Sequence, residues 1–214
     1  MNIIKKIFYK FFKELSPFYY KDINLTENIL KNVKMGDLTK VYKPYRILSV
    51  EIGKGTYISE NSKITITKIG KFCSIGPNLV CGWGIHPTNG ISTNPYFYSN
   101  RKQNGSTISD SNLLEERKKI VIGNDVFIGA NVTILDGIRI GDGAIIGAGS
   151  VVSKNIPDYA IAYGVPIEVK KFRFNKEERK KIKQTNWWDG NEEKLNKVKE
   201  NFYDIDNFLN EYNG

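Results

Sequence analysis

The stretch IGNDVF IGANVT ILDGIR IGDGAI IGAGSV VSKNIP occupies residues 122–157 and recurs every six residues. Each hexad begins with Ile or Val, and its second residue is Gly in four of the six. Periods of 3.6 or 2 residues, which mark helices and ordinary strands, do not explain this recurrence. A β-solenoid does, because each hexad then supplies one short strand, one inward aliphatic side chain and one tight corner.

A looser block of the same repeat lies upstream, and its third member is one residue short. Its hexads are IGKGTY (52–57), ISENSK (58–63), ITITK (64–68), IGKFCS (69–74) and IGPNLV (75–80). We therefore expect a solenoid domain over residues 47–166. Residues 82–119 interrupt it and are rich in Gly, Asn, Ser and Pro. A loop this long inside a compact domain is usually functional, and it holds His86, the single histidine of the chain.

The chain has 214 residues and a net charge of +9, of which residues 1–46 carry +6, from ten Lys or Arg against four Asp or Glu. Its 40% hydrophobic content excludes disorder, and a disulfide scaffold is not expected from two cysteines. We expect residues 1–46 to form a basic helical arm. Residues 2–15 read as an amphipathic helix that packs on the protein or lies on an anionic membrane. A bias toward Lys, Asn and Ile codons is an alternative explanation of the charge.

No apolar run reaches the ~18 residues of a membrane span, and the N-terminus has no secretory-signal pattern. We therefore expect a cytoplasmic protein, or one peripheral to the inner membrane face. With one histidine and two cysteines, a zinc centre is not expected, and neither is any other metal site.

The hexad rule stops after residue 166, and residues 167–214 are expected to form a C-terminal helical extension. Asn175 and Glu178 have the spacing of a capping box, so a helix is predicted over residues 176–185. A helical pair follows at 192–212, and the helices are expected to cap an open end of the solenoid. Trp187 and Trp188 are expected to pack them against the last coils.

Several stretches are similar to motifs of the hexapeptide-repeat acyltransferases, and more narrowly of the CatB-related, or xenobiotic, O-acetyltransferase branch. They cover about residues 45–190 and are specific in combination. The stretches are IGKFCSIGPN (69–78), GIHPTNGISTNPYFYS (84–99), IGNDVFIGANVTIL (122–135), IGDGAIIGAGSVVSKNIPDYAIAYGVP (140–166), and RFNKEER (173–179) leading to NWWD (186–189).

The resemblance implies an all-β solenoid, the left-handed parallel β-helix, in a homotrimer whose active sites lie between adjacent subunits. It implies acetyl-CoA as co-substrate and no metal. His86 matches the catalytic histidine of the family and would remove the proton of the acceptor hydroxyl in a ternary complex, while backbone amides stabilise the oxyanion. Cys73 is a rival nucleophile, but its hexad position points into the core, where a thiol is inert.

The resemblance also assigns binding positions, although small residues are required at solenoid corners in any case. Those matching coenzyme contacts are Phe127, Ala130, Ala148, Ser153 and Lys154, with Lys170 and Lys171 near the phosphates. Glu168 departs from the family, whose members often carry a basic residue there. The candidate acceptor contacts are Asn61, Ser92, Thr93, Tyr96 and Phe97, followed by Tyr98; packing or turn roles are an equal alternative for each.

We therefore expect an acetyl-CoA-dependent O-acetyltransferase that modifies a hydroxyl of a saccharide, such as a surface polysaccharide or its precursor. The first alternative is an enzyme that inactivates an antibiotic of the chloramphenicol or streptogramin type. The second, from another class, is a non-catalytic trimeric scaffold. The basic arm alone is too little for a nucleic-acid partner, because no groove-reading motif accompanies it.

Overall fold

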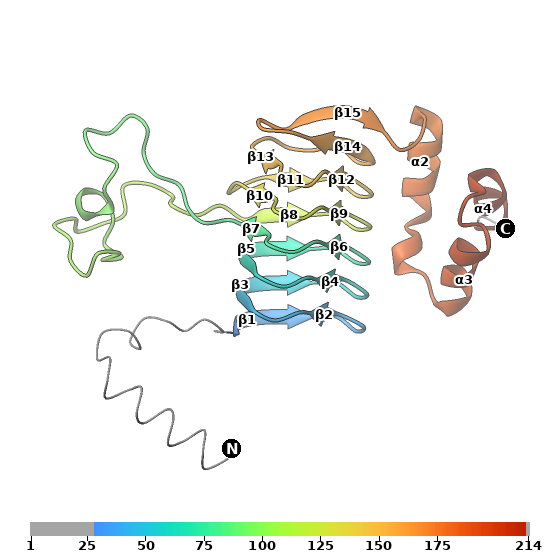
Figure 1. Ribbon diagram of the computed structural model, residues 1–214, viewed down its shortest axis with the longest axis horizontal. Coiled ribbons are helices and arrows are strands. Elements are labelled where there is room, and N and C mark those ends of the chain that lie inside the picture. Colours follow the sequence, from blue (N-terminus) through green and yellow to red (C-terminus); the bar gives the residue numbers. More distant parts are fainter. Residues whose placement is uncertain (1–27, 213–214) are drawn as a thin grey trace, which may run out of the picture.

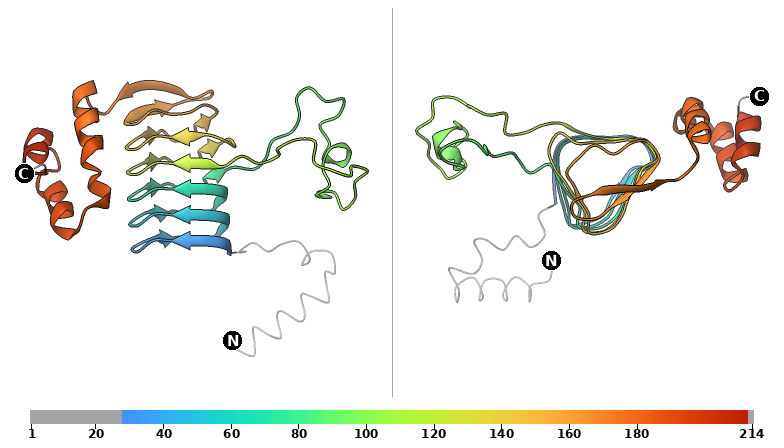
Figure 2. Two further views of the ribbon diagram at one scale, coloured as in Figure 1. Left: turned by 180° about the vertical axis from the view of Figure 1, so that it is seen from behind. Right: turned by 90° about the horizontal axis from the view of Figure 1, so that it is seen from above.

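The computed structural model describes residues 28–212 and shows a column of stacked parallel strands (Figure 1), which wind into coils that are triangular when seen from above (Figure 2, right). The strands are β1 (Ile29–Met35), β2 (Lys40–Val41), β3 (Tyr45–Ile52), β4 (Tyr57–Ile58), β5 (Ser62–Ile69), β6 (Ser74–Ile75), β7 (Val80–Cys81), β8 (Ile120–Ile122), β9 (Phe127–Ile128), β10 (Thr133–Ile134), β11 (Arg139–Ile140), β12 (Ile145–Ile146), β13 (Val151–Val152), β14 (Ala160–Tyr163) and β15 (Glu168–Phe172).

Each coil has three faces, and a long strand such as β5 bends across the corner between two of them. The first half of β5 pairs with β7, and its second half pairs with β8. We call the face of β7, β10 and β13 the first face and that of β8 and β11 the second. The third face is the sheet β15-β14-β12-β9-β6-β4-β2. On it, Tyr57 pairs with Ser74 and Phe127 with Ile145, so one coil takes 17 or 18 residues, or three hexads.

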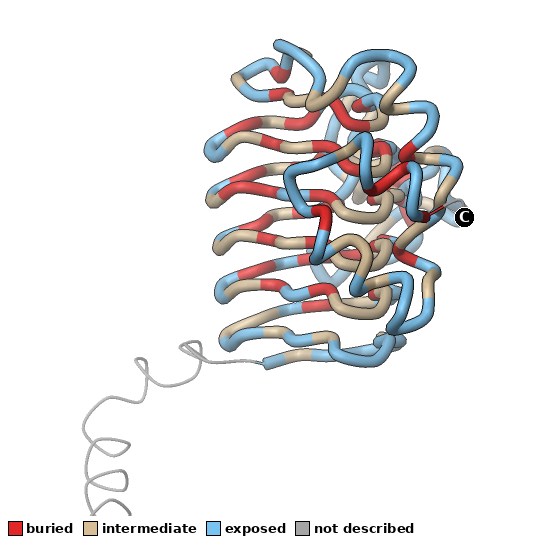
Figure 3. Tube along the Cα trace, turned by 90° about the vertical axis from the view of Figure 1, so that its right-hand side faces the viewer, coloured by how far each residue is buried: buried red, intermediate tan, exposed pale blue. Residues whose placement is uncertain are grey.

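The repeat directs one aliphatic side chain per hexad into the core. The first residues of the six hexads are each 1% exposed or less, and the fifth residues are buried as well. Buried residues therefore recur in every coil after the first (Figure 3). The first residues are Ile122, Ile128, Ile134, Ile140, Ile146 and Val152, and the fifth are Val126, Val132, Ile138, Ala144, Ser150 and Ile156.

The glycine at the second hexad position is required by the approach of neighbouring coils. A Cβ on Gly70 would lie 2.4 Å from the carbonyl oxygen of Gly123 one coil above. That separation is far inside van der Waals contact, so a side chain would push the two coils apart. The Gly in the repeat is thus a stacking requirement of the solenoid.

The interruption in the repeat is a loop that leaves the corner between the first and second faces. It begins after Cys81 at the end of β7 and ends at Ile120 at the start of β8, so its expected limits, 82–119, are observed. It extends far from the column and contains the short 3-10 helix η1 (Pro95–Phe97) (Figure 2).

The solenoid begins earlier than expected, and the boundary at residue 47 was wrong by about one coil. β1 pairs with β3 and β2 pairs with β4, so residues 29–46 belong to the first turn of the solenoid and do not form a helical arm. The repeat is unrecognisable there because this is the outermost coil, where Val33 and Val41 are only partly buried and most other positions face solvent. The amphipathic segment 2–15 lies outside the described residues.

The C-terminal helices are α2 (Lys176–Thr185), α3 (Glu192–Glu200) and α4 (Ile205–Tyr212), with the 3-10 turn η2 (Trp187–Asp189) between the first two. The predicted capping box is present: Asn175 Oδ1 accepts from the Glu178 amide at 2.9 Å, and a Glu178 carboxylate oxygen accepts from the Asn175 amide at 2.8 Å. The helices do not cap the column. They lie along its side, opposite the loop (Figure 2), while β15 turns back antiparallel on β14 at the last coil.

The side position of the helices follows from the aromatic residues that anchor them. Ile182 and Phe208 bury against Tyr159 at the corner between the second and third faces. Trp187 packs against this cluster, as expected for the last coil, and also on Phe72 of the third coil, with 5.6 Å between ring centroids. Among the helices of residues 28–212, none has both the length and the apolar character needed to cross a bilayer.

Candidate active site

His86 stands in the loop with its imidazole fixed at one nitrogen. Its Nδ1 lies 2.9 Å from the carbonyl oxygen of Thr93 and 2.8 Å from the hydroxyl of Tyr98. A carbonyl oxygen only accepts hydrogen bonds, so the contact with Thr93 assigns the proton to Nδ1. Nε2 is then the nitrogen with a free lone pair, which is the form of imidazole that acts as a base.

Two backbone contacts hold the segment that precedes the histidine. The Gly84 amide donates to Asp136 Oδ2 at 2.9 Å, and the Ile85 amide donates to the Glu116 carbonyl oxygen at 2.9 Å. Gly84 has a φ of +118°, a backbone conformation that L side chains rarely adopt. The chain therefore leaves the solenoid in a defined direction, with His86 two residues beyond the anchored turn.

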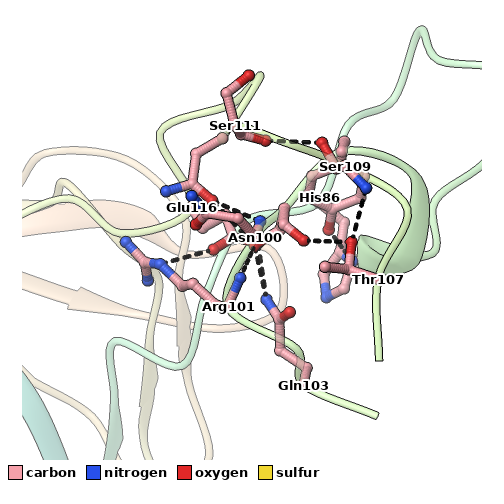
Figure 4. A network of polar contacts seen from close by, with 11 residues as sticks. His86, Asn100, Arg101, Gln103, Thr107, Ser109, Ser111 and Glu116 are labelled. Atoms are coloured by element: carbon pink, nitrogen blue, oxygen red, sulfur yellow. Dashed lines mark hydrogen bonds and ion pairs between the residues drawn. The ribbon is translucent and has the colours of Figure 1, made fainter. Parts of the chain in front are cut away.

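A buried carboxylate organises the interior of the loop (Figure 4). Glu116 is 5% exposed, and its Oε1 accepts from Gln103 Nε2 at 2.8 Å. Its Oε2 has no well-directed hydrogen bond but lies 3.1 Å from Nε of Arg101. A buried carboxylate needs such partners, because an unpaired buried charge is strongly destabilising. Sequence reasoning missed Glu116, Arg101 and the role of Tyr98, since no repeat or local pattern connects residues 12 to 30 positions from the histidine.

The expected coenzyme residues are divided between two corners and one face. Ala130 and Ala148 lie at the corner between the third and first faces, between β9 and β10 and between β12 and β13. Ser153 and Lys154 follow β13 and lie at the corner that bears the loop. Phe127 is 45% exposed on the third face. Within one chain, the histidine loop and the two alanines therefore occupy different edges of the prism.

The phosphate end of the expected coenzyme site carries negative as well as positive side chains. Lys170 and Lys171 lie on β15, and Lys170 forms an ion pair with Glu168. The hydrogen bond between them raises the pKa of Lys170 and lowers the pKa of the Glu168 carboxyl, with a smaller effect on Glu168 from Lys154. The departure at Glu168 thus offsets part of the positive charge that would meet a phosphate.

The expected acceptor residues divide into loop supports and open side chains. The Ser92 hydroxyl accepts from the Asn94 amide at 3.1 Å, and the Thr93 carbonyl holds His86, so both shape the loop. Tyr96 packs edge-on against Phe97 with centroids 5.2 Å apart, and Phe97 is 52% exposed. Asn61 lies apart from all of these, at the corner between the third and first faces, with a φ of +59°.

Both cysteines are core residues, as predicted. Cys73 and Cys81 are 0% exposed, and burial raises the pKa of each thiol to about 12. A thiol with such a pKa is protonated at neutral pH and is a poor nucleophile. Among residues 28–212, no group of three or more His, Cys, Asp or Glu side chains is placed to hold a metal ion.

A cavity of about 500 Å³ lies at another corner, between the solenoid and the C-terminal helices. Tyr159, Trp187 and Phe202 are among its lining residues, and Arg173 donates to Asp125 at 2.8 Å beside it. None of the residues expected to bind coenzyme or acceptor lines it. This cavity is therefore separate from the histidine site.

Residues 119–154 match the family model described as bacterial transferase hexapeptide (six repeats). Over these residues the chain carries the hexapeptide repeats of that model, and its fold is the left-handed parallel β-helix that such repeats form. The stated resemblance to hexapeptide-repeat acetyltransferases is confirmed by individual relatives. A chloramphenicol acetyltransferase of Klebsiella aerogenes is 37% identical over 59% of this chain and 61% of its own length. One of Morganella morganii is 33% identical over 56% and 58%.

Solved structures of acetyltransferases are also similar to this chain. A hexapeptide-repeat acetyltransferase of Vibrio cholerae, also solved with acetyl coenzyme A, has a TM-score of 0.53 at 26% identity; the two alignments cover 66% and 68% of this chain and 74% and 73% of that one. A galactoside acetyltransferase in complex with coenzyme A has a TM-score of 0.50 at 27% identity, over 69% of this chain and 68% of that one. The chain spans about three fifths of the length of the two curated relatives.

Proposed function

We propose that this protein is an acetyl-CoA-dependent O-acetyltransferase in which His86 is the general base. The observation that carries the proposal is the bond from Nδ1 to the Thr93 carbonyl oxygen, which leaves Nε2 free to accept a proton. The similarity to acetyltransferases, one of them solved with acetyl coenzyme A, supports the choice of thioester.

In the proposed reaction, Nε2 of His86 removes the proton from the acceptor hydroxyl as its oxygen attacks the thioester carbonyl of acetyl-CoA. The tetrahedral oxyanion is stabilised by backbone amides of the solenoid. When the C–S bond breaks, the acetyl ester remains on the acceptor, and the imidazolium returns its proton to the CoA thiolate. No covalent enzyme intermediate is required, in keeping with the buried, protonated state of Cys73.

The coenzyme is proposed to lie along the corner of Ala130 and Ala148, beside Phe127, with its phosphates toward Lys171. Because this corner and the histidine loop are different edges of one prism, a complete site requires two copies of the chain. The geometry thus supports a homotrimer in which the loop of one subunit reaches the small-residue corner of the next.

The acceptor is proposed to be a saccharide hydroxyl. The exposed ring of Phe97 and the neighbouring Tyr96 offer the flat apolar surface and hydroxyl that sugar rings use, and a galactoside acetyltransferase is among the similar structures. Chloramphenicol is the second candidate, because both curated relatives carry the name of its acetyltransferase.

The test is release of CoA thiol from acetyl-CoA with galactosides, maltose, amino sugars and chloramphenicol as acceptors. We expect His86→Ala to lower kcat by about 10²- to 10⁴-fold, the usual contribution of general-base catalysis, while acetyl-CoA binding measured by calorimetry is retained. Lys102→Ala, an exposed change in the same loop, is the control. A fully active His86→Ala protein would remove the base assignment, and no release with any acceptor would favour the scaffold. Release with chloramphenicol alone would select the second candidate.

A further inference from the structure

The hydroxyl of Tyr98 is the second group at Nδ1 of His86, and nothing in the proposed reaction so far uses it. We propose that Tyr98 is a positioning residue: with the Thr93 carbonyl, its oxygen accepts the Nδ1 proton and holds the imidazole with Nε2 available as the base. The inference rests on the proposed function for its kinetic consequence, but not for its structural one.

The two neutral tautomers of His86 differ in whether Nδ1 donates or accepts in its two contacts. The Thr93 carbonyl oxygen, 2.9 Å away, can only accept and therefore favours a proton on Nδ1. The Tyr98 hydroxyl, 2.8 Å away, can accept that same proton or donate its own to a bare Nδ1. Only the first choice satisfies both contacts, because a bare Nδ1 would face the carbonyl lone pairs. The pair of contacts therefore selects the tautomer that is competent as a base.

The buried charge of Glu116 supports the accepting role of the Tyr98 oxygen. Burial, and after it the negative charge of Glu116, raises the pKa of the Tyr98 hydroxyl, so the carboxylate acts on this group. A nearby anion attracts the hydroxyl hydrogen, and a hydroxyl whose hydrogen is turned away from Nδ1 can accept the Nδ1 proton. Gln103 and Arg101 hold the carboxylate in place.

Tyr98 is itself rigidly placed. It is 6% exposed, its amide donates to the Pro95 carbonyl oxygen at 3.2 Å, and its carbonyl oxygen accepts from the Leu113 amide at 2.9 Å. The tyrosine and histidine rings meet edge-on, at 88° with centroids 6.3 Å apart. An exposed histidine is thus tied through Nδ1 to a buried residue, which restricts the orientation of the ring.

The contact strengthens as the reaction proceeds. When Nε2 takes the acceptor proton, the ring becomes an imidazolium, and the Nδ1–H bonds to Thr93 and Tyr98 become charge-assisted. Such an interaction is stronger in the transition state than in the ground state, so its loss lowers kcat and leaves KM nearly unchanged. One hydrogen bond to a charged group corresponds to a fall in kcat of about 10- to 100-fold.

The structural half of the test uses the fact that the chain has a single histidine. In full-length, untagged protein labelled with ¹⁵N-histidine, the two ring nitrogens can be assigned without further mutants. At about pH 9, above the ordinary titration range of imidazole, we expect the wild type to show the proton on Nδ1. In Tyr98→Phe, which keeps the ring and its packing, we expect the population with the proton on Nε2 to rise.

The kinetic half compares Tyr98→Phe with Tyr203→Phe, the same change at a residue that is 95% exposed on the C-terminal extension. We expect kcat to fall about 10- to 100-fold only in Tyr98→Phe, with both KM values within about twofold and the melting temperature unchanged. An unchanged tautomer population in Tyr98→Phe overturns the inference, whatever the rate does. An unchanged kcat in an active enzyme overturns it as well. A wild type that is inactive with every acceptor refutes the proposed function alone, since the spectra still test the contact.

Discussion

Replacing Gly70 by Ala tests whether the repeat glycines are required by coil stacking. The added Cβ would lie 2.4 Å from the Gly123 carbonyl oxygen and 2.6 Å from Oδ1 of Asn124. Ordinary contacts begin near 3.4 Å, so the backbones must separate by about 1 Å where the Gly70 amide bonds to Ile122 at 2.9 Å. Overpacking usually costs 1 to 3 kcal/mol, and because backbone cannot rotate away we expect about 3 kcal/mol here.

Gly149→Ala is the matched control. Gly149 has a φ of +71°, but nothing lies within 4 Å of the position its Cβ would take. Only the left-handed conformation is then penalised, at about 1 kcal/mol. For a chain of this length, the melting temperature should fall by about 6 to 12 °C for Gly70→Ala and about 2 to 4 °C for Gly149→Ala.

Both variants are measured by circular dichroism during thermal and urea unfolding, at one fixed protein concentration because the proposed trimer would make stability depend on concentration. The reasoning is refuted if Gly70→Ala costs no more than Gly149→Ala. Glycine would then be present at the second hexad position for its backbone freedom, and the distance between coils would not be the constraint.

Three further outcomes are expected. Because burial raises the pKa of Cys73 to about 12, its thiol should not react with a disulfide reagent at pH 8 until the protein unfolds; rapid labelling of the native state would contradict this. Burial lowers the pKa of Lys183, but its hydrogen bonds and charge interactions with Asp158 and Asp142 together outweigh burial and raise the pKa above 10.5. The resulting stabilisation, under about 1 kcal/mol at this half-exposed site, is present below pH 10.5 and lost at higher pH. Lys183→Met should remove that alkaline loss in urea titrations, and an identical pH profile would count against it. Glu168→Gln should free Lys170 and lower the KM for acetyl-CoA about two- to fivefold, an effect that added salt should reduce; an unchanged KM would place the phosphates elsewhere.

The repeat predicts most of the fold because each hexad is a local unit. The aliphatic first positions from Ile122 to Val152 are all in the core, and the helix over residues 176–185 has its predicted limits. The repeat fails at residues 29–46, where the outermost coil has solvent on one side and needs few aliphatic residues. Local patterns also do not say what a helix packs against, so the side position of α2 to α4 was missed.

Sequence alone determined the solenoid, the loop at 82–119 and the inert cysteines, because each depends on residue type and spacing along the chain. The choice of His86 came from the similarity of residues 84–99 to a family motif and stays a prediction. The tertiary structure decided which nitrogen of His86 is free, through Thr93 seven residues away and Tyr98 twelve residues away. It also decided that the histidine and the alanines at 130 and 148 stand at different corners of the prism. Those facts depend on the path of a non-repetitive loop and on the winding of the coils, which bring together or separate residues without any regular spacing.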